Sequence, residues 1–150
     1  MQRITLPIIL SSALLVAGAV AVRWFHPHPV KAQSGCALST LQGSYGIRID
    51  GWILANDPSK APQAIAQVGT GVFDGAGNLT VVVTASTGGQ IFKQTFTLKY
   101  QVNADCSGSV TPMPGSDAGP ADIAVVNGGS QVLMVSTGPG ITFSGVAIRE

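Results

Sequence analysis

Hydrophobic and polar side chains alternate one by one along much of the chain after position 33. The clearest example is residues 91–102, in which one set of alternate positions holds Phe92, Phe96, Leu98, Tyr100 and Val102. The intervening positions hold Lys93, Thr95, Thr97, Lys99 and Gln101. A period of two is typical of a β-strand with one buried face and one solvent-exposed face. We therefore predict a strand here, with its aromatic and aliphatic side chains directed to the core.

The same period, interrupted by residues typical of turns, predicts about eight strands and no helix after position 33. The predicted strands are Ser44–Leu54, Ala64–Phe73, Leu79–Ser86, Ile91–Val102, Gly108–Pro112, Ala121–Val126, Gln131–Thr137 and Ile141–Arg149. Most connections are short and rich in Gly, Asn and Asp, as in 74–78 and 127–130. Since short turns join neighbouring strands antiparallel, the simplest topology is an up-and-down meander.

The predicted fold class is all-β, and residues 33–150 are expected to form one small antiparallel up-and-down barrel. Antiparallel strands of this number and length can close on themselves, which removes exposed sheet edges. A two-sheet β-sandwich is the alternative, because local patterns do not distinguish the two. The Pro-containing stretches 55–63 and 113–120 are the longest connections, and we expect exposed loops at a barrel mouth or a sheet edge.

Residues 1–32 differ from the rest of the chain. Residues 4–22 carry no charge and follow Arg3. A positively charged N-terminus, an apolar stretch and small residues before a cleavage site are typical of a secretory signal peptide. They predict a hydrophobic helix that serves as a signal peptide, with cleavage between Ala32 and Gln33. An uncleaved membrane anchor of residues 4–22 is the alternative, because the apolar run is nearly long enough to span a bilayer. Either way we expect an exported protein, secreted or periplasmic, with membrane contact only through this segment.

Charge is sparse and scattered. Charged residues make up 10% of the chain, and from Gln33 onward five basic residues face seven acidic ones, 5 − 7 = −2. Nucleic-acid binding needs clustered Lys and Arg side chains to neutralise phosphates, so this class of partner is excluded. The abundance of Gly, Ser, Thr and Val favours strands and turns over a helical bundle.

The sequence offers no catalytic, metal or cofactor site. Both histidines, His26 and His28, lie in the predicted leader, so the mature domain contains none. This excludes imidazole acid-base catalysis and His-activated nucleophiles. The aspartates mostly occupy turn-like contexts, where they cap or bend the backbone. A function without catalysis is therefore favoured.

Cys36 and Cys106 are the two cysteines, seventy positions apart. In an exported protein they are expected to form a disulfide. Closing a loop of that length stabilises the fold by roughly 4 kcal/mol in the chain-entropy model. A redox-active pair is the alternative, but it lacks the C-x-x-C spacing that such chemistry uses.

Several short motifs point to a family. Cys36-Ala37-Leu38 and Leu41-Gln-Gly-Ser-Tyr-Gly46 precede F-D-G-x-G-N-L-T at 73–80 and Y-x-V-N-x-D-C-x-G at 100–108. With these motifs the chain resembles small exported bacterial proteins that have an allene oxide cyclase-like barrel. The resemblance spans nearly all of the residues after the leader, and it implies a calycin-type barrel without an established activity. No catalytic residue of the plant cyclase matches a position here, so none is assigned.

Two residues are candidates for a ligand pocket. Arg48 and Trp52 share one face of the first predicted strand with Asp50, although an aromatic beside a charge pair is more common on an outer sheet face. The first hypothesis is that a small apolar ligand binds inside the barrel. The second is a non-catalytic structural or interaction module of the cell envelope, and the third is an enzyme that works by cavity shape. A ligand-sized cavity is the observation that the first hypothesis requires.

Overall fold

The computed structural model describes residues 35–54 and 59–150. In these residues lie the strands β1 (Gln42–Ile53), β2 (Gln63–Asp74), β3 (Asn78–Thr87), β4 (Gln90–Val102), β5 (Ser107–Pro112), β6 (Ala121–Val126), β7 (Gln131–Ser136) and β8 (Ile141–Arg149). Two short 3-10 helices, η2 (Leu38–Thr40) and η3 (Asn127–Gly129), accompany them.

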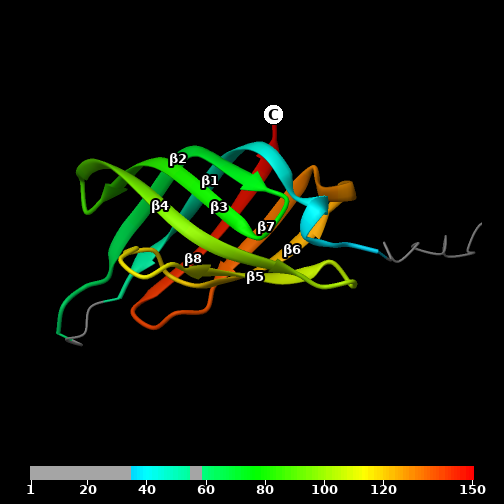
Figure 1. The fold of residues 1–150 in the computed structure, drawn as a ribbon. Coiled ribbons are helices and arrows are strands. Elements are labelled where there is room, and N and C mark those ends of the chain that lie inside the picture. The colour runs from blue at the N-terminus through cyan, green and yellow to red at the C-terminus, as the bar shows by residue number, and fades with distance from the viewer. Residues whose placement is uncertain (1–34, 55–58) are drawn as a thin grey trace, which may run out of the picture. The chain divides into compact units, whose positions relative to one another are not determined.

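The strands form one closed barrel. Each strand pairs antiparallel with the next in sequence, and β8 returns to pair with β1 (Figure 1). The predicted all-β, up-and-down barrel is confirmed, and the sandwich alternative is wrong. Each predicted strand agrees with an observed one to within two residues at either end. The 3-10 helix at 38–40 was not predicted, because three residues are too few to show a helical period.

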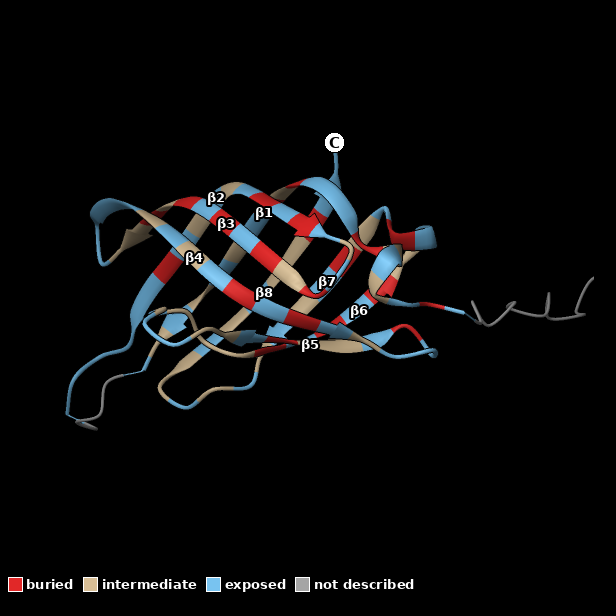
Figure 2. Cartoon of the chain, in the orientation of Figure 1, coloured by how far each residue is buried: buried red, intermediate tan, exposed pale blue. Residues whose placement is uncertain are grey.

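The inward and outward faces of each strand follow the alternation in the sequence. In β3 the side chains of Leu79, Val81, Val83 and Ala85 are buried, while Thr80 and Val82 between them are exposed. Figure 2 shows the result as buried and exposed bands that succeed each other along the strands. The inward side chains of all eight strands form one hydrophobic core inside the barrel.

The disulfide expected from the sequence is present. Cys36 and Cys106 are bonded, with their Cα atoms 5.1 Å apart, and both side chains are buried. The bond connects the segment that precedes β1 to the turn between β4 and β5, so it closes a loop of seventy positions.

The expected signal peptide, its cleavage between Ala32 and Gln33 and the alternative anchor at 4–22 lie outside the described residues. Among the residues that are described, no helix is long and apolar enough to cross a membrane.

Candidate functional site

The barrel has two ends that carry different chain segments. One end, called here the closed end, carries the turns β2–β3, β4–β5 and β6–β7, the segment 35–41 and the C-terminal residue (Figure 1). The opposite end, called here the mouth, carries the connections β3–β4, β5–β6 and β7–β8. This division follows from the meander, because alternate turns of an up-and-down barrel lie at opposite ends.

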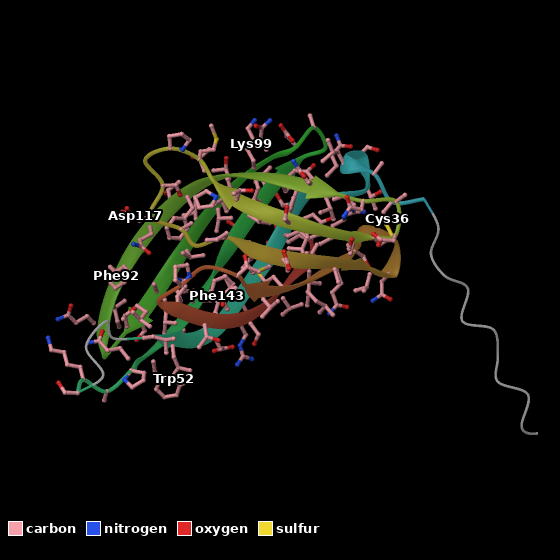
Figure 3. All side chains as sticks on the ribbon, turned by 90° about the horizontal axis from the view of Figure 1, so that it is seen from below. Cys36, Trp52, Phe92, Lys99, Asp117 and Phe143 are labelled. Atoms are coloured by element: carbon pink, nitrogen blue, oxygen red, sulfur yellow. A yellow bond between two sulfur atoms is a disulfide. The ribbon has the colours of Figure 1, made fainter. Side chains whose placement is uncertain are left out.

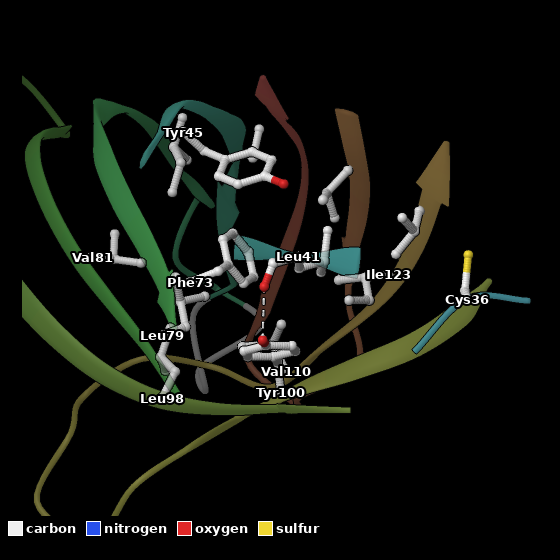
Figure 4. Packing of buried hydrophobic residues seen from close by; sticks show 14 of the residues in the cluster. Cys36, Leu41, Tyr45, Phe73, Leu79, Val81, Leu98, Tyr100, Val110 and Ile123 are labelled. Atoms are coloured by element: carbon white, nitrogen blue, oxygen red, sulfur yellow. Dashed lines mark hydrogen bonds between the residues drawn. The ribbon is translucent and has the colours of Figure 1, made fainter. Parts of the chain in front are cut away.

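Aromatic rings fill the interior near the closed end. The ring of Phe73 meets that of Tyr45 at 4.9 Å and that of Tyr100 at 5.1 Å between centroids, both edge to face. Leu41 is fully buried beside them, and the Tyr100 hydroxyl donates a hydrogen bond of 2.9 Å to the Leu41 carbonyl oxygen (Figure 4). Edge-to-face rings are a favourable packing mode.

A hydrogen-bond network ties the last strand to the segment before the first. The Tyr45 hydroxyl donates to the Gly129 carbonyl oxygen and accepts a bond of 2.8 Å from the guanidinium of Arg149. The same guanidinium donates to the Thr40 carbonyl oxygen at 2.8 Å. Hydrogen bonds therefore connect the 3-10 turn at 38–40 to β8 directly and to η3 through Tyr45, so that the turn lies against the closed end of the barrel.

The mouth half of the barrel contains an apolar cavity of about 230 Å³. Its wall includes inward side chains of β1, β2, β4, β6, β7 and β8, and residues 117–119 of the β5–β6 loop contribute to it. Phe92 and Phe143 lie toward this end, opposite Cys36 (Figure 3). Aliphatic and aromatic side chains line the cavity, whereas at the closed end the edge-to-face rings of Tyr45, Phe73 and Tyr100 pack against one another.

The β5–β6 loop contributes more than the sequence indicated. Residues 113–120 connect two strands at the mouth, as expected, but they are not simply an exposed loop. Ala118 packs against the hydrophobic core and lines the cavity together with Gly119. Asp117 beside them is exposed and also borders the cavity. The loop therefore forms part of the cavity wall, where β5 is too short to continue beside β4.

Four polar side chains border the otherwise apolar cavity: Gln67, Thr87, Gln94 and Asp117. The hydroxyl oxygen of Thr87 is buried and has no hydrogen-bond partner in the described structure. Gln67 on β2 and Gln94 on β4 lie on either side of β3, in register with Ala85 and Val83 respectively. No lysine or arginine of the described residues belongs to the wall. A site of this kind suits a mainly apolar molecule with few polar groups.

Arg48 and Trp52 lie on the outer surface of the barrel. Inward positions of β1 are odd-numbered, as Ile47 and Ile49 show, so the even-numbered candidates point outward. Arg48 forms an exposed ion pair of 2.8 Å with Asp50, and Trp52 is 51% exposed. They do not line the cavity, so the pocket interpretation of these two residues is corrected in favour of the outer sheet face, the more common case given beside it. Gln67 and Gln94 were not selected from the sequence, although polar residues at inward positions of predicted strands could have indicated the cavity wall.

The groups with a displaced pKa lie at the closed end. Three bonds, from the Asn78 side chain and from the backbone N–H groups of Asn78 and Ala76, lower the pKa of Asp74 from 3.8 to about 2. Hydrogen bonds from Ser107 lower the pKa of Asp105, and burial raises that of Tyr100. None of the three lines the cavity. Within the described residues there is also no cluster of three side chains able to hold a metal ion.

No family model and no curated protein matches this chain. Among solved structures, the chain is similar to a redesigned β-barrel, mFAP1, in a structure with bound DFHBI. The TM-score is 0.51 at 18% sequence identity, and the match covers 75% of this chain and 98% of that one. At this identity the likeness shows the barrel fold alone. None of these comparisons supports the likeness to allene oxide cyclase-like proteins, which stays a prediction from the sequence motifs.

Proposed function

We propose that this protein binds a small apolar ligand in the cavity at the mouth of its barrel. The observation that carries the proposal is the cavity itself, lined by aliphatic and aromatic side chains, among them Phe73, whose ring packs edge to face against Tyr45 and Tyr100. The solved barrel of similar fold, mFAP1, has DFHBI bound, which supports the idea that such a barrel can hold a ligand.

The cavity of about 230 Å³ suits a small, mainly apolar ligand. Burying an aliphatic chain contributes about 0.8 kcal/mol per methylene, from which the loss of translational and rotational freedom is subtracted. Eight carbons contribute about 6 kcal/mol and the subtracted cost is at least about 4 kcal/mol, so such a ligand is expected to bind weakly, with a Kd in the millimolar range or above.

The proposal includes export. In it, residues 1–32 are a signal peptide cleaved before Gln33, and 33–150 are the mature domain, acting outside the cytoplasm. The buried disulfide supports this, because disulfides persist in oxidising compartments. The motifs at 73–80 and 100–108 support kinship with the exported allene oxide cyclase-like barrels, without a catalytic role.

A titration with octanol followed by methyl NMR signals tests ligand binding. Octanol is chosen as the probe because it is small and mainly apolar and carries one hydroxyl group. The methyl signals of inward residues such as Ile49 and Ile123 are expected to shift, whereas those of the outward Val68 and Val72 are not. Shifts confined to outward methyls, or none, would overturn the proposal.

A pair of variants on β7 locates the binding. Met134 lines the cavity and is partly buried, while Leu133 beside it is 45% exposed on the outer face. In Met134→Trp the larger ring occupies the cavity, and the Kd for octanol is expected to rise at least about tenfold, a loss of about 1.4 kcal/mol. Leu133→Trp adds the same ring outside and is expected to leave the Kd unchanged. Equal effects of the two variants would show that octanol binds elsewhere.

A further inference from the structure

Two uncharged amides are built into the apolar wall of the cavity. Gln67 and Gln94 are both partly buried, and no side-chain hydrogen bond joins either to another described residue. Ala85 and Val83 of the strand between them are the cross-strand partners of Gln67 and Gln94, so the two amides occupy neighbouring levels of the wall. Among the described residues, the buried side-chain atoms without a partner do not include those of Gln67 or Gln94, so the two amides remain accessible, and a polar group in the cavity can supply a hydrogen-bond partner.

A third polar group lies one level closer to the mouth. Thr87 pairs with Ile65, two residues from Gln67 along β2, and its buried hydroxyl lacks a partner in the described structure. A buried hydroxyl without a partner is unfavourable by about 1–3 kcal/mol. Amide and hydroxyl groups both donate and accept, so together they match alcohol, carbonyl or amide groups on a ligand.

The cavity has nothing to neutralise a negative charge. The wall contains no lysine, arginine or histidine of the described residues, and its one charged side chain is Asp117 at the rim. Moving a carboxylate out of water into an apolar cavity without a cation is strongly unfavourable. The Asp117 carboxylate adds repulsion at the entrance.

From these observations we infer that the cavity selects uncharged ligands, an aliphatic or aromatic body with one or two hydroxyl, carbonyl or amide groups, and rejects anionic ligands such as carboxylates. In this inference, Gln67 and Gln94 form hydrogen bonds with the polar group of the ligand. This inference rests on the proposed function, since it names the chemical class that the same cavity takes.

The test compares four probes of matched chain length by the same NMR titration at neutral pH: octane, octanol, octanoate and methyl octanoate. Octanol is expected to bind at least about tenfold tighter than octanoate, and the uncharged ester is expected to recover most of that difference. Octanol is also expected to bind more tightly than octane after allowance for the solubility of each probe in water.

Variants assign the selection to the amides. In Gln67→Leu/Gln94→Leu, which keeps the side-chain size, octanol is expected to lose about tenfold in affinity and octane to gain affinity, because the unpartnered amides are gone. Gln101→Leu, on the outer face of β4, is the matched control and is expected to change neither Kd.

The outcomes separate the inference from the proposed function. If octanoate binds as tightly as octanol, or if the double variant keeps the preference for octanol over octane, the inference is wrong while ligand binding stands. If none of the four probes shifts the inward methyl signals, the proposed function fails and the inference fails with it.

Discussion

The two ends of this barrel are made from the same eight strands, yet only one of them is sealed. At the closed end a disulfide, three interlocked aromatic rings and the Arg149 network hold the 3-10 turn at 38–40 in place. At the mouth, inward side chains such as Phe92 and Phe143 are only partly covered, and they line a cavity in the interior of the barrel. The contrast teaches that the cross-linked end and the cavity are separated along the barrel axis, so we expect that each can be altered without the other.

The largest expected effect tests the closed end. In Cys36→Ala/Cys106→Ala the loop of seventy positions is no longer cross-linked, and the free energy of unfolding is expected to fall by about 4 kcal/mol. Chemical denaturation measures the loss. The Kd for octanol of the folded fraction is expected to stay within about twofold, since neither cysteine lines the cavity. A stability loss below about 1 kcal/mol, or a collapse of binding in the folded protein, would contradict the separation of the two ends.

A matched pair of glycines gives the next largest effect. Gly129 at the closed end and Gly89 at the mouth have φ angles of +84° and +85°. A Cβ on Gly129 would lie 2.4 Å from the Thr40 carbonyl oxygen, whereas a Cβ on Gly89 would meet nothing within 4 Å. Gly89→Ala is expected to lose about 1 kcal/mol from the left-handed backbone alone, and Gly129→Ala about 3 kcal/mol.

Urea denaturation of both glycine variants measures the difference. If Gly89→Ala were as destabilising as Gly129→Ala, the closed end would not be more tightly packed than the mouth, and the comparison would fail.

The smallest effect concerns pH. Asp74 lies in the closed-end turn β2–β3, and its pKa is lowered from 3.8 to about 2 chiefly by bonds from Asn78. A lowered pKa means that the ionised carboxylate stabilises the fold above pH 3.8 and that this contribution is lost as the pH falls toward about 2. Asp74→Ala is therefore expected to lower Tm at neutral pH, and the difference from the parent protein is expected to disappear near pH 2.

The mouth supplies the control for this titration. The β3–β4 turn, Gly88-Gly89, has no acidic side chain, so the Tm difference caused by Gly89→Ala is expected to be the same at neutral and low pH. Thermal unfolding followed by circular dichroism measures both series. A pH-independent Tm difference for Asp74→Ala would show that its carboxylate does not act through its charge.

The strands of this protein could be predicted nearly to the residue. In β4 the alternation of Phe96, Leu98 and Tyr100 with threonine and lysine places the first three inside, because side chains of a strand point to opposite faces in turn. The pairing of Cys36 with Cys106 was also predictable, since the chain has two cysteines and its sequence predicts export. The order of the strands in the sheet was predictable because short turns join strands that are neighbours in the sequence.

The candidate site could not be predicted in the same way. Arg48 and Trp52 were selected because they are chemically conspicuous, but the parity set by Ile47 and Ile49 places them outside. Gln67 and Gln94 look unremarkable in the sequence and become neighbours of one cavity only when β2, β3 and β4 are paired in register.

The sequence by itself determined where the strands begin and end, which side chains face inward and which two sulfur atoms join, because each depends on local period or on a simple count. Only the tertiary structure decided that the sheet closes, that one end is filled by rings and that the other keeps a cavity. Empty space inside a barrel depends on how side chains from strands far apart in the chain meet at the same level, and no local pattern contains that information.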